Sequence, residues 1–350
     1  MSSVGKVALD AATPKQAIFA SILYRELKEK YEVEVLAREE TQTIDLLELL
    51  KTPYLKMGKY GGGTLEGKLE ATIKQEAEIL RHFKETGKPD VLWTHGNVSG
   101  VRVAYGLGVP IIYSNDTLHN EPVVRLTVPL ASHLIIPEAY RRGDWVKYGI
   151  ELEKITRFKG IEEVAWVKNL KPDREEVMEK MFGRVVDRLI VVRGTEYMAC
   201  YSKGRDVDLL KILEELAKYG TVVFLPRYRE EERVIEKLKN VVVPSGVPFA
   251  AELVVAADLV VGSGGTICRE AALQGTPTIC FYFKEAIINY LMRKGFPISY
   301  IPEIKSILEK SIRILRDPDR FRSDTSPILE RMESPVPVIL KYIKSYAFKP

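Results

Sequence analysis

The sequence predicts an α/β fold with two domains, each a doubly wound parallel sheet. The first observation is length, because 350 residues exceed what one hydrophobic core usually accommodates. The second is the alternation of short β-rich runs with amphipathic helical segments in both halves of the chain. The third is that runs such as 189–192 are apolar throughout, which is typical of parallel strands covered by helices on both faces.

In the first half, strands are expected at 7–10, 34–37, 54–57, 90–93, 110–113 and 133–136. Helices are expected at 14–30, 41–50, 65–86 and 99–106. Pro14 suits the first turn of a helix, where its missing N–H has no partner, and Gly87 suits the position after a helix end.

In the second half, strands are expected at 189–192, 221–225, 241–243, 259–261 and 278–281. Helices are expected at 207–219, 230–239, 249–257, 267–274 and 286–294, with a final apolar helix at 338–346. The alternation lapses between the halves, in a charged stretch that contains Gly160 and Lys171-Pro172-Asp173.

Four segments follow from this pattern. We expect an N-terminal Rossmann-like domain at 1–150, an interdomain connection at 151–188, a C-terminal Rossmann-like domain at 189–326 and a tail helix at 327–350. By analogy with other two-domain folds of this kind, the tail helix is expected to pack back on the first domain.

Composition narrows the function classes. The net charge of +4 is small, and without clustered basic residues it speaks against a nucleic-acid partner. Three unpaired cysteines favour a reducing compartment over a disulfide framework. We find neither a signal-peptide core nor an apolar run of roughly 18 residues, so we expect a soluble, cytoplasmic protein without a transmembrane segment. Peripheral membrane contact and the oligomeric state stay open.

Polar residues follow the predicted strands, and open α/β sheets bind ligands beyond the carboxyl ends of their strands. Four of these residues can carry or move charge and are the candidate catalytic residues: Asp10, Lys15, His95 and Asp116. Three more are expected in cleft loops: Gly62, Asn97 and Asn115. Arg193 and Arg227 end strands of the second half, where guanidinium groups could clamp a diphosphate as readily as form structural ion pairs.

The segment from Gly262 to Glu270 is the sharpest signal. The predicted strand at 259–261 is followed by three glycines and two small hydroxyl residues, and a predicted helix starts directly after them. Glycines let backbone N–H groups approach a phosphate, and the helix N-terminus adds roughly half a positive charge. The predicted nucleotide-binding residues are Ser263, Gly264, Gly265, Thr266 and Glu270, with Glu270 directed to a ribose diol. The alternative is a tight turn with Glu270 as a surface carboxylate.

These residues carry a family resemblance. The runs 257–265 and 270–277 resemble the donor-binding segment of GT-B glycosyltransferases, close to the lipid-II-forming N-acetylglucosaminyltransferase, in which the helix glutamate binds the uridine ribose. Residues 263–265 also resemble the Ser-Gly-Gly segment of non-hydrolysing UDP-N-acetylglucosamine 2-epimerases, and 89–97 resembles their Pro-Asp to His-Gly-Asp strand and loop. Over the whole chain, Asn115-Asp116-Thr117 and Arg193 resemble domain of unknown function 354, an archaeal and bacterial family. The resemblance implies a GT-B fold.

Two positions depart from these relatives. The epimerases place a catalytic aspartate where this chain has Asn97, and an amide cannot act as a general base. The first-strand loop of the uncharacterised family usually has histidine where this chain has Lys15, which could neutralise a phosphate or a leaving-group charge.

The leading hypothesis is a glycosyltransferase-like enzyme that binds a UDP-sugar and transfers the sugar to an unknown acceptor, a glycan, a lipid-linked or a small molecule. The alternatives are a sugar-nucleotide epimerase, favoured by His95-Gly96, and a non-catalytic nucleotide-binding or assembly protein. No cofactor or metal is expected, since in the string Asp206-Val207-Asp208 the first aspartate suits a helix N-cap and the last a carboxylate in the first turn of that helix.

Overall fold

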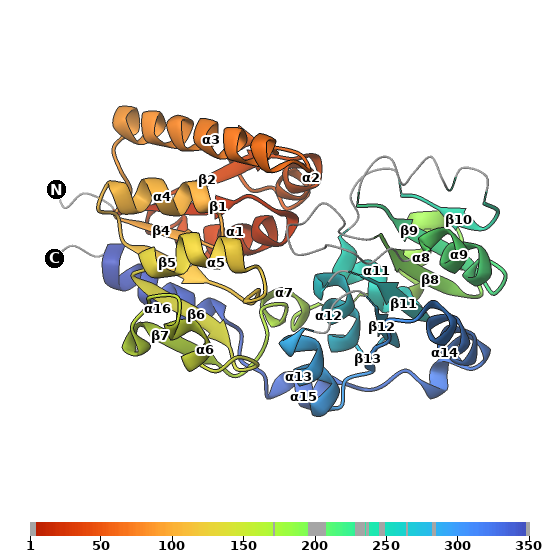
Figure 1. Cartoon of the computed structure of the whole chain (residues 1–350). Helices are drawn as coiled ribbons and strands as arrows, with labels where there is room; N and C mark the ends of the chain where they lie inside the picture. The colour runs from red at the N-terminus through yellow and green to blue at the C-terminus, as the bar shows by residue number, and fades with distance from the viewer. Residues whose placement is uncertain are drawn as a thin grey trace. The chain divides into compact units, whose positions relative to one another are not determined.

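The computed structural model in Figure 1 divides into two compact units. Unit 1 comprises Met1–Ala165 and Glu333–Pro350, and unit 2 comprises Trp166–Met332. The structure describes residues 5–170, 172–194, 208–227, 235, 238–244, 249–263, 265–281 and 285–347. The last segment of the chain therefore belongs to unit 1, where the terminal helix α16 (Val336–Ala347) packs against four strands of the sheet.

Unit 1 contains a seven-stranded parallel sheet in the order β3-β2-β1-β4-β5-β6-β7. Its strands are β1 (Lys6–Ala11), β2 (Glu32–Glu39), β3 (Leu55–Lys59), β4 (Val91–Thr94), β5 (Ile111–Ser114), β6 (His133–Pro137) and β7 (Ile155–Phe158). The helices are α1 (Pro14–Leu27), α2 (Thr41–Leu49), α3 (Leu65–Thr86), α4 (Val98–Gly106), α5 (Glu121–Thr127) and α6 (Gly143–Val146). Strand order reverses between β1 and β4, which makes their carboxyl ends the switch point where such sheets bind ligands.

Unit 2 contains a six-stranded parallel sheet in the order β10-β9-β8-β11-β12-β13, with its switch point between β8 and β11. The strands are β8 (Leu189–Arg193), β9 (Thr221–Leu225), β10 (Val241–Val242), β11 (Leu259–Gly262), β12 (Thr278–Cys280) and β13 (Ile298–Tyr300). The helices are α8 (Arg174–Phe182), α9 (Leu209–Leu216), α11 (Ala250–Ala256), α12 (Gly265–Leu273), α13 (Ala286–Lys294), α14 (Ile304–Arg316) and α15 (Ser326–Glu330). A short helix, α7 (Val164–Val167), contains the boundary between the units.

The fold class predicted from the sequence is confirmed: both sheets are parallel and both carry helices. The apolar runs occupy the sheet centres because their side chains are buried on both faces, as in β8, where the four residues before Arg193 are fully buried. The predicted helices at 65–86 and 286–294 have the observed ends.

Several elements were not predicted. The segment 151–188 contains β7 and α8, and the region after 297 contains β13 and α14. Strands of three or four residues with polar members, such as Thr156 and Arg157 in β7, offer too short a pattern to distinguish from a loop. The predicted helix at 230–239 lies largely outside the described residues.

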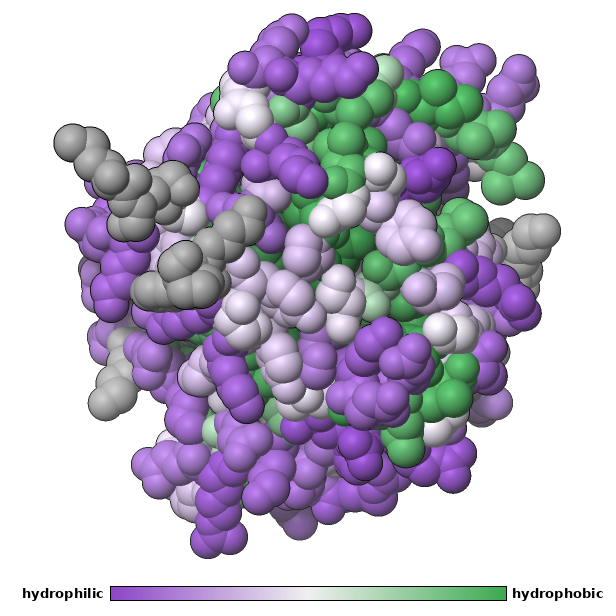
Figure 2. Space-filling view, turned by 90° about the vertical axis from the view of Figure 1, so that its left-hand side faces the viewer, coloured by the Kyte–Doolittle hydropathy of each residue, from purple (hydrophilic) through white to green (hydrophobic). Residues whose placement is uncertain are grey.

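The face of the molecule drawn in Figure 2 carries both hydrophilic and apolar side chains. On the face drawn in Figure 2, hydrophilic side chains cover most of the area and apolar side chains form smaller patches. Among the described helices, none combines the length and the apolar composition that crossing a membrane requires.

Candidate functional site

Unit 1 brings five ionisable side chains together beyond the carboxyl ends of its strands: the partly buried Lys15 and the buried His95, Asp116, Glu162 and Glu163. We call this set the acidic cluster. The Lys15 ammonium lies 2.6 Å from Glu162 Oε2 and 3.3 Å from Glu163 Oε1, and it also pairs with Asp116. Both glutamates are fully buried. One cation therefore stabilises three carboxylates that water cannot reach.

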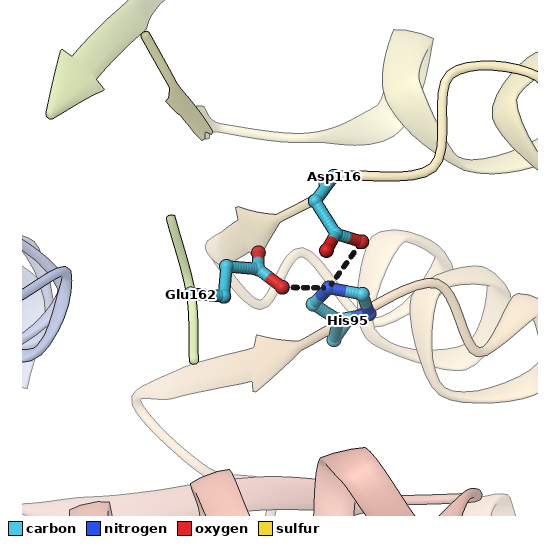
Figure 3. Close-up of side chains that lie close together, drawn as sticks. All are labelled: His95, Asp116 and Glu162. Carbon is cyan, nitrogen blue, oxygen red and sulfur yellow. Dashed lines mark hydrogen bonds and ion pairs between the residues drawn. The ribbon is translucent and has the colours of Figure 1, made fainter. Parts of the chain in front are cut away.

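His95 forms the second positive element of the cluster. Its Nε2 lies 2.7 Å from Glu162 Oε2 and 3.6 Å from Asp116 Oδ1, as Figure 3 shows. Burial by itself lowers the pKa of His95, but the Glu162 and Asp116 carboxylates outweigh it and raise the pKa to about 9. His95 is therefore protonated at neutral pH and suits a proton donor rather than a base.

The loops after the strands place the side chains of the acidic cluster at the same edge of the sheet. Lys15 lies in the first turn of α1, which begins after the Thr13 N-cap. The next residue, Gln16, donates from Nε2 to the His95 carbonyl at 2.5 Å and accepts from the Ala12 amide at 2.6 Å. The loop after β1 is thereby tied to the loop after β4.

Asp116 follows β5 and is held through its neighbours. Its Oδ1 accepts from the Thr117 hydroxyl at 2.7 Å, and its carbonyl accepts from the Tyr140 hydroxyl at 2.7 Å. Asn115 lies beside it, donating to the Tyr113 hydroxyl at 2.6 Å and accepting from the Thr117 amide at 2.5 Å. Asn115 thus shapes this loop, and its side chain supports the strand end rather than the cluster.

Asp10 lies at the switch point itself, at the end of β1. Its carboxylate accepts from the Asn97 amide at 2.8 Å and from the Thr94 hydroxyl at 3.1 Å. A side chain at Gly100 would collide with Asp10 Oδ2, so the first turn of α4 must carry glycine there. Burial raises the pKa of Asp10 to about 7, although both hydrogen bonds favour the charged form. A group with that pKa can take up and release a proton near neutrality.

Asn97 lies where the epimerases that this segment resembles have an aspartate, and its side chain makes two hydrogen bonds. Its Oδ1 accepts from the Ser99 amide at 3.2 Å as the N-cap of α4, while its Nδ2 donates to Asp10. The carboxylate at this place in the site is therefore that of Asp10, from a neighbouring strand. Gly62 lies apart from this group, in the loop between β3 and α3, where a φ of 75° requires glycine.

The glycine turn of unit 2 lies at the other switch point. Ser263 follows β11, and its hydroxyl donates to the Gly194 carbonyl at 2.6 Å, which ties the ends of β11 and β8 together. Gly265 and Thr266 are the first two residues of α12, so their backbone groups belong to the unpaired N-terminal turn. Gly264 lies outside the described residues.

Glu270 lies further along α12 and is buried. Its Oε1 accepts from the Trp166 indole N–H at 2.8 Å. The alternative of an exposed surface carboxylate is therefore wrong for Glu270.

The two arginines end up in different settings. Arg193 ends β8, and its Nη1 donates to the Leu225 and Pro226 carbonyls at 3.4 and 3.1 Å. Arg227 follows β9 and is half-buried. Both lie at strand ends of unit 2, as the sequence indicated, and their role as diphosphate ligands stays a prediction.

Sequence reasoning missed Glu162, Glu163 and Trp166. A signal was present, because two adjacent glutamates interrupt the otherwise apolar run 161–167, and carboxylates in such a run are rarely buried without a partner. The sequence predicts a connection there because the short, partly polar pattern of β7 does not distinguish that strand from a loop.

Three members of the cluster also have the chemistry of metal ligands. His95, Asp116 and Glu162 each offer a ligand atom, and these atoms lie within 4.8 Å of one another. The Lys15 ammonium lies among them, 2.6 Å from Glu162, and supplies the positive charge that the carboxylates need. The expectation that no metal is required stays a prediction.

Two parallel sheets, each with its own switch-point site, define a GT-B-like α/β protein, and comparison with known proteins agrees. The chain belongs to the family described as protein of unknown function (DUF354), whose model matches residues 6–347. It is 29% identical to the uncharacterized protein MJ0665 of Methanocaldococcus jannaschii over 303 residues, 84% of this chain and 87% of that protein.

Solved structures share the fold at low sequence identity. The UDP-GlcNAc 2-epimerase of Neisseria meningitidis bound to UDP-GlcNAc matches with a TM-score of 0.73 at 14% identity, covering 97% of this chain and 100% of that one. The UDP-GlcNAc 2-epimerase of Methanocaldococcus jannaschii in complex with UDP-GlcNAc and UDP matches with a TM-score of 0.72 at 19% identity, covering 96% and 99%. At such identities the likeness establishes the fold.

Proposed function

We propose that this protein is an enzyme that binds a UDP-sugar and transfers the sugar to an acceptor hydroxyl. The glycine turn and α12 would hold the diphosphate, Glu270 would accept from the ribose diol, and Arg193 and Arg227 would offset the charge of the departing UDP. The observation that carries the proposal is the buried Glu270 carboxylate on the helix that begins at the switch point of unit 2. The UDP-sugars named with the solved relatives support it.

The proton chemistry is assigned to unit 1. Transfer needs a base for the acceptor hydroxyl, and Asp10 has a pKa close to neutrality. Glu162 Oε1 is buried and has no hydrogen-bond partner among the described residues, so an acceptor hydroxyl would satisfy it. Protonated His95 would act as a hydrogen-bond donor to the acceptor.

Binding is tested by calorimetric titration with UDP and UDP-N-acetylglucosamine. Glu270→Gln keeps the shape of the side chain and removes its charge, and we expect it to weaken UDP binding about tenfold or more. Glu215→Gln is the matched control in unit 2, because Glu215 pairs with Lys218 on the surface. Absence of binding at millimolar UDP, or equal binding by Glu270→Gln and the native protein, would contradict the proposal.

Epimerisation is the second candidate, and a specific observation favours it. Asp10 places a carboxylate beside the His95-Gly96-Asn97 loop, where the amide of Asn97 could not act as a base. Incubation with UDP-N-acetylglucosamine in D2O separates the two reactions. An epimerase incorporates deuterium into the sugar, whereas a transferase releases UDP only with an acceptor and incorporates none.

A further inference from the structure

Arg38 of unit 1 carries a positive charge that the proposed transfer does not yet use. We propose that Arg38 binds an anionic group, a phosphate or a carboxylate, on the molecule that enters unit 1. Under the proposed function, on which this inference rests, that molecule is the sugar acceptor. The acceptor would therefore be an acidic compound.

The first step concerns the place of Arg38 in the sheet. Arg38 lies near the carboxyl end of β2, the strand beside β1. Asp10 of β1 is paired with Leu36, and Arg38 follows two residues later. Because side chains alternate along a strand, Asp10 and Arg38 lie on the same face of the sheet. Burial raises the pKa of Asp10 to about 7, and the charge of Arg38 is among the effects that oppose this rise. A group bound to Arg38 would thus lie near the proposed base.

The second step concerns the donors of the guanidinium. Its Nε is buried and has no hydrogen-bond partner among the described residues. Its Nη2 lies 3.6 Å from Glu40 Oε2, which is an ion pair but too long for a hydrogen bond. The same oxygen of Glu40 accepts from the Thr43 hydroxyl at 3.2 Å. The Arg38 side chain is 24% exposed, so a ligand can approach it. An oxyanion would satisfy these donors, because the planar guanidinium matches a carboxylate or a phosphate.

The third step concerns the surroundings of Arg38. The Tyr60 ring supports the guanidinium, with its centroid 5.3 Å from Cζ. Helix α2 begins directly after Glu40, whose side chain makes no capping hydrogen bond to the helix. The first turn of α2 has no acidic residue, so the partial positive charge of this helix start adds to that of Arg38. The adjacent Glu39 is paired with Lys59 at 3.1 Å. These surroundings favour a bound anion.

The test uses two-dimensional proton–nitrogen NMR spectra of the full chain, with inorganic phosphate and acetate as probes. The Nε–H signal of Arg38 is assigned by its absence from Arg38→Met, and the backbone amides of Glu39 and Glu40 report on the site in both proteins. Arg157→Met is the matched control, since Arg157 also lies near a strand end of unit 1 and donates to the Glu138 carbonyl at 2.7 Å. Sodium chloride at equal ionic strength controls for screening.

We expect phosphate or acetate to shift the Arg38 Nε–H signal and both amides saturably in the native protein and in Arg157→Met, with a midpoint in the millimolar range. Arg38→Met should raise the midpoint of the amide shifts about tenfold or more, because charge-assisted hydrogen bonds are lost. A response to phosphate alone assigns a phosphorylated acceptor, and a response to acetate assigns a carboxylate.

The absence of a saturable shift with either anion would overturn the inference, as would equal midpoints in the native protein and Arg38→Met. The reporters lie in unit 1, so phosphate bound at the glycine turn of unit 2 does not contribute to their shifts. The measurement needs neither UDP nor a sugar. Failure of the UDP titration would therefore overturn the proposed function without changing the result for Arg38.

Discussion

The two sheets have the same strand order around their switch points, but different groups line these points. In unit 1 the switch point is lined by charged side chains from several strand ends, with Lys15 and His95 opposite three carboxylates. In unit 2 the described part of the switch point combines small residues and the backbone of a helix N-terminus with Arg193, the Arg269–Glu285 pair and the buried Glu270, whose carboxylate accepts from an indole. The same arrangement of strands therefore presents two different sets of groups at its switch point, and the loops decide which.

The difference has an energetic consequence. Buried charges are tolerated only when partners surround them, so the acidic cluster depends on the folded arrangement of residues from four loops. Backbone N–H groups at a helix start have no such requirement, because the helix itself positions them. Substitutions in unit 1 should consequently affect stability and pH dependence, whereas substitutions in the unit 2 turn should affect ligand binding.

Lys15→Met should have the largest effect of the variants that test this difference between the two switch points. Removal of the ammonium leaves Asp116, Glu162 and Glu163 without their shared cation, and we expect a loss of roughly 3–5 kcal/mol in the free energy of unfolding. Urea unfolding followed by circular dichroism measures it. Lys74→Met is the control, because Lys74 pairs with Glu70 at 3.9 Å on the exposed surface of α3 and should change stability by less than about 1 kcal/mol. Equal effects of the two variants would mean that the cluster does not depend on charge compensation.

A second change should have opposite effects on stability and on activity. The pKa of Asp10 is about 7 in the folded protein against an ordinary 3.8, so its ionisation opposes folding increasingly as the pH rises from 4 to 7. Asp10→Asn should therefore stabilise the protein at pH 8, by up to about 4 kcal/mol, and have little effect at pH 4. Turnover of the UDP-sugar should fall about 100-fold or more.

Thermal unfolding at both pH values checks the first expectation for Asp10→Asn and a coupled UDP-release assay the second. Asp187→Asn is a suitable control, since its side chain is 98% exposed. Unchanged turnover in Asp10→Asn would remove this residue from the catalytic set.

The smallest of the three effects concerns His95. Its pKa of about 9 exceeds the ordinary 6.5, so the folded protein retains a proton between these values that the unfolded chain releases. Stability from this source is complete below pH 6.5 and is lost as the pH rises through 9, a decrease of about 3 kcal/mol. His95→Gln should flatten the decline of melting temperature across this window. A decline of the same slope in the variant would assign the pH dependence to other groups.

Much of the fold followed from local pattern. Apolar runs at 189–192 and 221–225 and the helix at 65–86 predicted their elements because periodicity and turn residues act over a few neighbouring positions. The strand-end rule also placed Asp10, Lys15, His95 and Asp116 at one edge of the first sheet. Short strands such as β7 were not predicted, and the two glutamates that follow β7 were therefore not predicted as site residues.

The partners within each site came from contacts distant in the chain. Asn97 donates to Asp10 across 87 positions, Glu162 meets His95 across 67, and Trp166 meets Glu270 across 104. A pKa depends on burial and on charges in space, so nothing local indicated that Asp10 titrates near neutrality or that His95 stays protonated. Residue patterns were sufficient for the two parallel sheets and the glycine turn, because these are set by short-range periodicity and backbone freedom. The folded arrangement assigned each side chain its partner and its charge.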